Sequence, residues 1–331
     1  MRVCVIGGGS WGSAMALHLG RKNIDTHLWI REKNIYEDTL RYNENKIFLP
    51  GSKFSPSVSF FHEIEACVQR TDIVFFAVPS KFSREIYNKL KPYLTSENII
   101  VSLTKGIEDG TLKRMSEVML EIFSPYFRPR LAVLSGPSFA REVAIAHPTA
   151  VVVASDENAV AKEVQHLVSG AFLRAYTSED MLGVEIAGAL KNVVALAAGI
   201  SDGLRFGDNS RAALITRGLA EITRLGIKLG AKRETFAGLA GVGDLVLTCT
   251  GQLSRNHYVG YEIGQGKQLQ EVVSQMKMIA EGITTTLSGF QLAQRENIEM
   301  PIHEQAYLVL YKNKNPRKAL QDLMARKLKN E

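Results

Sequence analysis

The 331-residue chain is poor in the residues that build disulfide frameworks and metal centres. Its three cysteines (Cys4, Cys67 and Cys249) are an odd number and lie far apart, and two of them stand in apolar runs. Such cysteines are typical of small buried hydrophobic residues in a reducing compartment, which excludes a disulfide or zinc framework. The seven histidines show no metal-ligand spacing, and no H-E-x-x-H or C-x-x-C motif occurs. We therefore expect no bound metal.

Long uninterrupted apolar runs are also scarce. The N-terminal run has only four residues before a group of glycines, which is too short for a signal peptide. Residues 181–200 are rich in Ala, Val and Leu, but Glu185, Lys191 and Asn192 lie near the middle, where charge is costly in lipid. This segment is predicted to be a buried core helix. We expect a cytoplasmic protein with no integral membrane segment.

A dense block of Lys and Arg with interleaved aromatic residues is missing as well, although the net charge is +6. This mild positive charge suits anionic small molecules, and we expect no nucleic-acid partner. The most basic segment runs from Lys312 to Lys329 and is predicted to be a solvated terminal helix. Weak attraction of that segment to an anionic membrane surface is the alternative.

What the sequence does have begins with a glycine motif at the N-terminus. An apolar run over residues 3–6 leads into Gly7-x-Gly9-x-x-Gly12, and a helical pattern follows. In dinucleotide-binding folds these glycines permit a tight turn, a close approach of the backbone to the pyrophosphate, and close packing of helix on strand. The pyrophosphate then lies on the N–H groups of the helix N-terminus. A turn without a ligand is the alternative, but the flanking strand and helix favour a dinucleotide site.

Charged residues follow the second predicted strand, at residues 26–30, and bear on cofactor choice. Arg31 comes nineteen residues after Gly12, and Glu32 and Lys33 follow it. An acidic residue at this distance binds the ribose 2′-hydroxyl of NAD, whereas an arginine accommodates the 2′-phosphate of NADP. We predict that NADP(H) is preferred through Arg31 and that NAD(H) is tolerated because Glu32 could turn in. A solvated charge cluster at the strand end is the alternative.

Apolar strands and helical segments alternate through the first half of the chain. The pattern predicts an α/β Rossmann-type domain with a mostly parallel sheet over residues 1–180. Ligands collect at the carboxyl ends of the strands in such a sheet. The predicted strands are 72–78, 98–103, 131–134 and 150–153, and the predicted helices are 83–90 and 112–122.

Helical patterns replace the strands beyond about residue 177. They predict an all-helical domain over residues 181–331. This organisation predicts an active site in the cleft between the two domains. The predicted helices are 180–200, 210–229, 269–278, 284–296 and the last thirty residues.

Lys191 is the most suggestive candidate for chemistry. It lies in the middle of an apolar helical segment, with Ala187 and Ala195 on the same face. Burial among small residues would lower the pKa of its ammonium group, so that the side chain could exchange protons near neutrality. The alternative is a lysine whose tip reaches water.

Other polar residues stand at predicted strand ends or in loops. Lys105 follows one strand, and the turn at residues 135–138 offers hydroxyls and backbone donors to an anion. Asp244 lies in a glycine-rich loop, where an Asx-turn is the simpler explanation. Ser254-Arg255-Asn256 combines groups that suit a phosphate. The alternatives are an ordinary surface lysine for Lys105, a plain turn for residues 135–138 and a surface loop for residues 254–256. His147 is interpreted as structural.

Seven segments together resemble the bacterial NAD(P)-dependent glycerol-3-phosphate dehydrogenases. They occur in the order of that family between residue 5 and about residue 290, and only the last forty residues carry no diagnostic motif. Trp11 stands where the family often has Phe, so an aromatic residue is retained. The segments are GGGSWG (7–12), SLTKG (102–106), LSGPSFA (134–140), GALKNV (188–193), RAALITR (211–217), GVGD (241–244) and SRN (254–256).

This resemblance implies reversible reduction of dihydroxyacetone phosphate to sn-glycerol 3-phosphate for phospholipid synthesis. It implies that Lys191 is the proton donor and acceptor, and we expect a homodimer. The implied substrate contacts are Lys105, Gly136, Ser138, Lys191, Asp244, Ser254, Arg255 and Asn256. The implied cofactor contacts are Gly7, Gly9, Ser10, Trp11, Gly12, Arg31, Lys105, Ala140, Arg255, Ile279 and Glu281.

Two other functions remain open from the residues alone. One is a related two-domain dehydrogenase that acts on a small hydroxy acid, against which the phosphate-binding tripeptide at 254–256 argues. The other is a non-catalytic nucleotide-sensing protein, which would leave a buried Lys191 unexplained.

Overall fold

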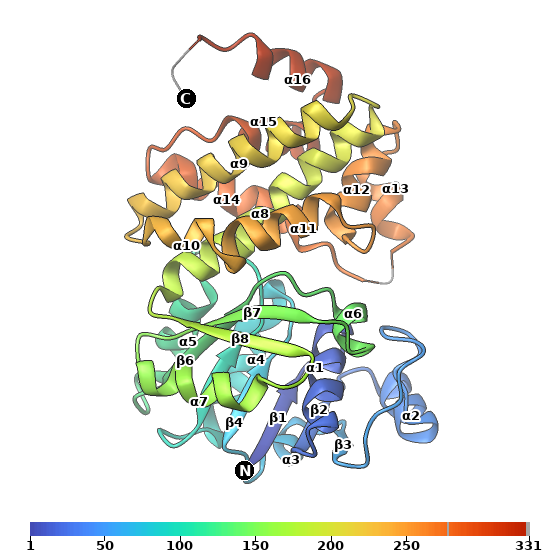
Figure 1. Ribbon diagram of the computed structural model, residues 1–331, viewed down its shortest axis with the longest axis vertical. Helices are drawn as coiled ribbons and strands as arrows, with labels where there is room; N and C mark the ends of the chain where they lie inside the picture. Colours follow the sequence, from blue (N-terminus) through green and yellow to red (C-terminus); the bar gives the residue numbers. More distant parts are fainter. Residues whose placement is uncertain (277, 329–331) are drawn as a thin grey trace. The chain divides into compact units, whose positions relative to one another are not determined.

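The computed structural model describes residues 1–276 and 278–328 (Figure 1). Its contacts divide the chain into two compact units. The first, called here the sheet unit, comprises Met1–Lys105 and Lys113–Glu185. The second, the helical unit, comprises Gly106–Leu112 and Ile186–Glu331. A short excursion of the chain at 106–112 therefore belongs with the helices.

An eight-stranded sheet forms the centre of the sheet unit, in the order β3-β2-β1-β4-β5-β6-β7-β8. All neighbouring strands are parallel except β6 and β7. The order of the first six strands is that of a Rossmann fold, so the predicted fold class is confirmed. The strands are β1 (Arg2–Ile6), β2 (Asp25–Trp29), β3 (Val58–Phe61), β4 (Ile73–Phe76), β5 (Ile99–Ser102), β6 (Arg130–Ser135), β7 (Thr149–Ala154) and β8 (Leu173–Ser178).

Sequence patterns missed β3 and β8, the two edge strands of the sheet. Edge strands are only partly covered and therefore lack a continuous apolar run. In β8 the buried Leu173 and Ala175 alternate with the exposed Arg174 and Tyr176. The central strands β4 and β5, by contrast, are buried throughout.

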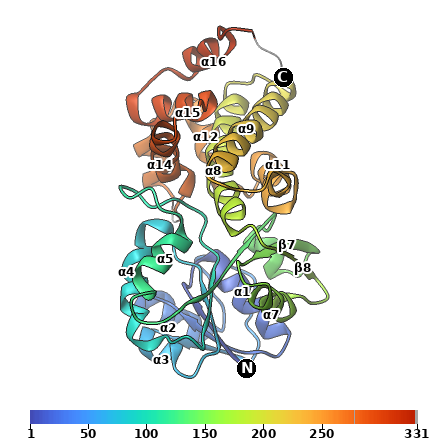
Figure 2. The ribbon, with the colours of Figure 1, turned by 90° about the vertical axis from the view of Figure 1, so that its left-hand side faces the viewer.

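Helices cover both faces of the sheet, with α1 and α7 on one side and α4 and α5 on the other (Figure 2). The predicted helix at 112–122 begins later, at Met115, because Leu112 adopts a left-handed φ of 59°. The helices are α1 (Ser10–Arg21), α2 (Lys33–Tyr42), α3 (Ile64–Val68), α4 (Ser80–Leu90), α5 (Met115–Phe123), α6 (Ala140–Ala144) and α7 (Asn158–Val168), with a 3₁₀ turn at Lys91–Tyr93.

The cysteines are buried free thiols. Cys4 on β1 and Cys67 on α3, far apart in sequence, have their Sγ atoms 2.9 Å apart in a hydrogen bond. Burial raises the pKa of Cys4 well above its ordinary value and the pKa of Cys249 to about 12. The thiols of Cys4 and Cys249 are therefore neutral. All three buried cysteines pack as small hydrophobic residues, as the sequence predicts.

The helical unit is built around α8 (Met181–Gly203), whose first turn lies in the sheet unit. α8 is long and apolar enough to span a membrane, yet 89% of its apolar window is buried. That burial agrees with a core helix. The others are α9 (Asp208–Lys228), α10 (Arg233–Ala237), the π-helix η2 (Leu239–Gly243), α11 (Asp244–Thr250), α12 (Arg255–Gly264), α13 (Leu269–Ser274), α14 (Glu281–Arg295), α15 (Pro301–Lys312) and α16 (Pro316–Met324).

Two predicted helices differ from the observed ones. The helix predicted over 269–278 ends at Ser274, and residue 277 lies outside the described part of the chain. The last thirty residues do not form one helix, because Asn313 takes a left-handed φ of 52° and Asn315 caps a new helix that starts at Pro316. Lys329 of the basic segment also lies outside the described residues.

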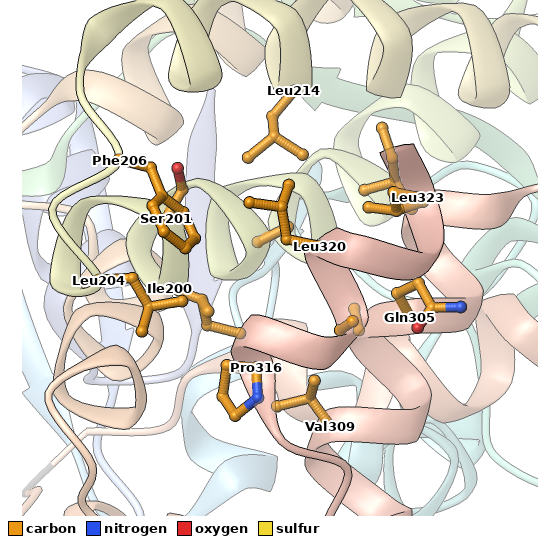
Figure 3. A pocket seen from close by; sticks show the side chains of 14 residues that line it. Ile200, Ser201, Leu204, Phe206, Leu214, Gln305, Val309, Pro316, Leu320 and Leu323 are labelled. Atoms are coloured by element: carbon orange, nitrogen blue, oxygen red, sulfur yellow. The ribbon is translucent and has the colours of Figure 1, made fainter. Parts of the chain in front are cut away.

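Helix α16 covers an apolar cavity of about 50 Å³ within the helical unit (Figure 3). Leu204 and Phe206 line it from the connection between α8 and α9, and Leu214 lines it from α9. Leu320 and Leu323 line it from α16. The charged face of α16 is exposed on the other side of the helix. The terminal helix is therefore amphipathic and packs its apolar side on the unit.

Glycines allow α8 and α12 to cross with their backbones in contact. A Cβ atom on Gly199 would lie 2.1 Å from the carbonyl oxygen of His257, and one on Gly260 would lie 2.1 Å from that of Leu196. Gly203 and Gly264 meet in the same way one turn further along. The crossing fixes the start of α12, which carries Arg255, against the helix that carries Lys191.

We expect Gly260→Ala to lower the free energy of unfolding by at least ~2 kcal/mol, although alanine is the better helix former, because its Cβ has no space. Gly289→Ala on α14 is the matched control, since its Cβ would meet only the flexible end of Leu190, at 2.8 Å. Urea unfolding followed by circular dichroism measures both. Equal stability of the two variants would contradict the close crossing.

Candidate functional site

The glycine turn between β1 and α1 has the geometry of a dinucleotide cradle. Gly7 has φ 121°, and a Cβ there would lie 2.7 Å from the carbonyl oxygen of Ala77. A Cβ on Gly12 would lie 1.9 Å from the carbonyl oxygen of Gly7. Gly9 differs, because no heavy atom of the described residues, apart from its chain neighbours, lies within 4 Å of its Cβ position. The first and third glycines thus permit close packing, and the second leaves open space for a pyrophosphate.

The N-terminus of α1 completes this cradle. Gly9 is its N-cap, and no side chain among the described residues caps the helix there. Its first N–H groups can therefore bind phosphate oxygens. Ser10 donates to the carbonyl oxygen of Phe48 at 2.8 Å, and Trp11 packs against the apolar core. The residues present fit a nicotinamide dinucleotide, which lies at this strand-order switch point in Rossmann folds.

Arg31 lies just beyond the end of β2 with its side chain exposed. Its guanidinium pairs with Glu32 at 2.7 Å and lies 5.2 Å from the centre of the Phe82 ring. The structure thus brings together the two residues that the sequence assigns to NADP and NAD. A 2′-phosphate bound at Arg31 would therefore compete with Glu32 for the same guanidinium.

Other predicted residues of the sheet unit meet at the ends of β5 and β6. Lys105 donates from Nζ to the carbonyl oxygen of Gly136 at 3.3 Å, and Ser138 donates to the same oxygen at 2.9 Å. Gly136 has φ 131°, and a Cβ there would lie 3.0 Å from Cα of Val151. Ala140 begins α6 directly after this turn. A cation and a hydroxyl therefore gather at the carboxyl ends of two neighbouring strands.

In the helical unit, Lys191 forms a buried ion pair with Asp244. The two residues are 5% and 1% exposed. Lys191 Nζ donates to the Asp244 carboxylate and, at 2.7 Å, to the hydroxyl of Thr248. Thr248 in turn donates to the backbone carbonyl of Asp244 at 2.6 Å. The alternative of a lysine whose tip reaches water is thus wrong. Asp244 supplies the negative charge that a buried ammonium requires.

The residues next to Lys191 and Arg255 connect three helices. Asn256 donates from Nδ2 to Asn192 at 2.9 Å, and its Oδ1 accepts from the backbone N–H of Gly282 at 2.9 Å. Ser254 caps α12 by accepting from the N–H of His257. These bonds hold the start of α12 between α8 and α14.

Arg255 extends from the first position of α12 toward the segment before α14. It donates to the carbonyl oxygen of Ile279 at 2.9 Å. Desolvation by the surrounding protein lowers the pKa of its guanidinium and Glu281 opposes this, but an arginine stays charged at neutral pH. Arg255, Ile279 and Glu281, which the family resemblance assigns together to the cofactor, are therefore neighbours.

The structure thus places the predicted residues of the sheet unit at the carboxyl ends of its strands, and hydrogen bonds connect those of the helical unit. The sheet unit holds the glycine turn, Arg31 and the Lys105–Gly136 group, and the helical unit holds Lys191, Asp244 and the 254–256 segment. Sequence reasoning missed Thr248 and Asn192. Thr248 lies one helical turn after Asp244, and Asn192 directly follows Lys191. Each could therefore have been found from its position next to a candidate residue.

Comparison with known proteins identifies the same family for the N-terminal and the C-terminal part of the chain. The family model for the NAD-dependent glycerol-3-phosphate dehydrogenase N-terminus matches residues 2–161, and that for the C-terminus matches residues 180–321. The glycerol-3-phosphate dehydrogenase (NAD(P)+) of Citrifermentans bemidjiense is 50% identical over 330 residues, which cover 100% of this chain and 98% of that protein. That of Geobacter sulfurreducens is 50% identical over 330 residues, with the same coverage of both chains.

Solved structures give the same result. The crystal structure of glycerol-3-phosphate dehydrogenase from Coxiella burnetii superposes with a TM-score of 0.95 at 38% identity, and the match covers 98% of this chain and 99% of that one. A D-mandelate dehydrogenase shares the fold alone, with a TM-score of 0.63 at 12% identity.

The Rossmann sheet, the dinucleotide cradle and the helical unit define an NAD(P)-dependent oxidoreductase. The match of both family models and the 50% identity over the full chain are more specific. The chain belongs to the NAD-dependent glycerol-3-phosphate dehydrogenase family.

Arg31→Ala is expected to weaken NADPH binding by roughly 1.5–3 kcal/mol, the contribution of a hydrogen bond to a charged group, and to change NADH binding little. Glu32→Gln should act in the opposite direction by releasing the guanidinium. Fluorescence titration with each dinucleotide measures both variants. Equal losses for NADPH and NADH in Arg31→Ala would show that Arg31 does not bind the 2′-phosphate.

Proposed function

We propose that this protein reversibly reduces dihydroxyacetone phosphate to sn-glycerol 3-phosphate with NAD(P)H, and that Lys191 donates the proton. The observation that carries the proposal is the buried Lys191 ammonium held between Asp244 and Thr248. Family membership supports the reaction, and the names of the relatives support both cofactors.

Lys191 suits the chemistry of carbonyl reduction. The nicotinamide, when bound, supplies a hydride to the carbonyl carbon. The carbonyl oxygen then gains negative charge, which an ammonium stabilises and finally protonates. The carboxylate of Asp244 offsets the cost of burying the Lys191 ammonium, and the hydroxyl of Thr248 fixes the direction of Nζ. In the reverse direction the neutral amine accepts the proton of the substrate hydroxyl.

Arg255 is the proposed binding group for the substrate phosphate. Its described hydrogen bond uses one of five guanidinium N–H groups, so donors remain for phosphate oxygens. The amide of Asn256 likewise has a second N–H beyond the one bonded to Asn192. Ser254 caps the helix whose first residue is Arg255. We propose Lys105, Gly136 and Ser138 as the substrate contacts from the sheet unit.

The proposed cofactor contacts are those of the glycine turn, with Arg31, Lys105, Ala140, Arg255, Ile279 and Glu281. We also propose a dinucleotide-binding domain over 1–180 and a substrate domain over 181–331, and a homodimer that works in the cytoplasm. The product would supply glycerophospholipid synthesis. These points rest on the resemblance to the bacterial enzymes.

Removal of the proton donor tests the role of Lys191. Lys191→Met should lower kcat by at least ~10²-fold while NADPH still binds, because general acids contribute 10²–10⁴-fold. The single variant also leaves the Asp244 carboxylate buried without a partner, which is strongly destabilising. The double variant Lys191→Met/Asp244→Asn removes that charge and should fold while remaining as slow. Near-normal turnover in the folded double variant would remove Lys191 from the mechanism.

The phosphate contact is tested with dihydroxyacetone, which has the same carbonyl but no dianion. With saturating NADPH, Arg255→Ala should lower kcat/KM for dihydroxyacetone phosphate by a factor that corresponds to about 2–4 kcal/mol of transition-state stabilisation, and it should leave kcat/KM for the bare triose almost unchanged. Arg255→Lys should rescue the loss only partly, since it keeps the charge but not the planar fork. The quantity measured is the ratio of the two kcat/KM values. An unchanged ratio would mean that another residue, with Lys105 as the next candidate, holds the phosphate.

A further inference from the structure

A second group of basic side chains lies in the sheet unit, at the opposite end of α1 from the glycine turn. His18, Arg21, Lys22 and His147 line a cavity of about 110 Å³, which is called here the basic cavity. A single water needs roughly 10–15 Å³ of such space, so the basic cavity has room for a larger group. The half-exposed Phe172 lies at its edge. The twelve residues of α1 separate it from the pyrophosphate cradle by about 18 Å.

The basic side chains are held in place by carbonyl groups. Arg21 donates to the carbonyl oxygens of Val143 and Ala144, where α6 ends. Lys22 donates to the carbonyls of Leu167 and Ser169 at the end of α7, and His18 Nε2 bonds to that of Val168 at 2.6 Å. Positive side chains commonly cap helix C-termini in this way. Carbonyl groups orient the cations without neutralising them.

The positive charge of the basic cavity lacks a carboxylate partner. None of the residues that line it is acidic, and neither Arg21 nor Lys22 forms an ion pair with any part of the chain that the structure describes. Burial lowers the pKa of His18, and the charges of Lys22 and Arg21 lower it further. Burial also lowers the pKa of Arg21 and of Lys22. An anion in the cavity would oppose this lowering of the pKa, because a nearby negative charge favours the charged form of each group.

Donors remain for such an anion. The described bonds of Arg21 use two of its five guanidinium N–H groups. The imidazole of His147 makes no hydrogen bond within the described residues, and its backbone N–H is fixed by the carbonyl of Glu142 at 2.9 Å. A guanidinium fork and an imidazole therefore face one cavity beside a second fixed cation. This arrangement matches a group with several acceptor oxygens and high negative charge.

We propose that the basic cavity is a binding site for a phosphate dianion, either inorganic phosphate or a phosphate monoester, separate from the substrate and cofactor sites. Arg21 and His147 bind its oxygens, and Lys22 supplies charge. The site uses only residues of the sheet unit, and it stands independently of the role proposed for Arg255.

Titration with inorganic phosphate, followed through the imidazole resonances of His147 in a nuclear magnetic resonance spectrum, reports on this cavity directly. The resonances should shift saturably with phosphate, and those of the buried His27 should not. Potassium chloride at matched ionic strength should leave both unchanged. Glycerol 2-phosphate forms the second arm: saturable binding there identifies a monoester site, and its failure identifies a site for free phosphate.

Two variants and one control complete the test. Arg21→Gln should weaken the phosphate-dependent shift at least ~10-fold through loss of a charge-assisted contact, whereas Lys162→Gln, an exposed cation on α7, should stay within about twofold. Arg21 also caps α6, so Arg21→Gln could disturb that helix. His147→Ala avoids this problem, because the imidazole of His147 makes no hydrogen bond within the described residues. Calorimetry in an Arg255→Ala background, which removes the proposed substrate-phosphate contact, should still detect phosphate binding. Adding His147→Ala to that background should weaken the binding. Shifts that chloride reproduces, or affinities that neither variant changes, would overturn the proposal.

Discussion

The buried ion pair between Lys191 and Asp244 is the constraint on which the helical unit depends. Two charges with almost no exposure are stable only while each has the other, and loss of one partner leaves an uncompensated charge in the interior. The helices that carry them, α8 and α11, must therefore stay in register. Thr248 makes the arrangement directional, because it accepts from Lys191 and donates to the backbone at Asp244.

Close backbone packing maintains that register. The π-helix η2 leads directly into α11, and a Cβ on Gly241 would lie 2.1 Å from the carbonyl oxygen of Phe236. Gly199 on α8 and Gly260 on α12 bring the backbones of these two helices into contact. Asn256 then joins α12 to α8 and to α14. The proposed proton donor and the proposed phosphate-binding arginine therefore stand on helices that cannot slide past one another.

Local features were predictable from the sequence, and long-range ones were not. The glycine turn, the central strands and α8 follow from short patterns, because a turn geometry or a buried strand is specified by neighbouring residues. The antiparallel β7, the edge strands β3 and β8, and the break at Asn313 depend on what packs beside them or on one backbone dihedral. For the candidate site, burial of Lys191 was expected from its small neighbours. Its pairing with Thr248 joins residues 57 positions apart, which no local pattern shows.

Restoration of activity by free amines is the sharpest test of Lys191 as a proton donor held by Asp244. Lys191→Ala leaves a space beside Asp244 that a small alkylammonium ion can enter. If Lys191 is the proton donor that Asp244 holds, ethylammonium should restore dihydroxyacetone phosphate reduction saturably in Lys191→Ala and not in Lys191→Ala/Asp244→Ala. If a folded, NADPH-binding Lys191→Ala protein shows no amine-dependent turnover, Lys191 is not the proton donor. If the double variant is rescued equally well, Asp244 does not hold the donor.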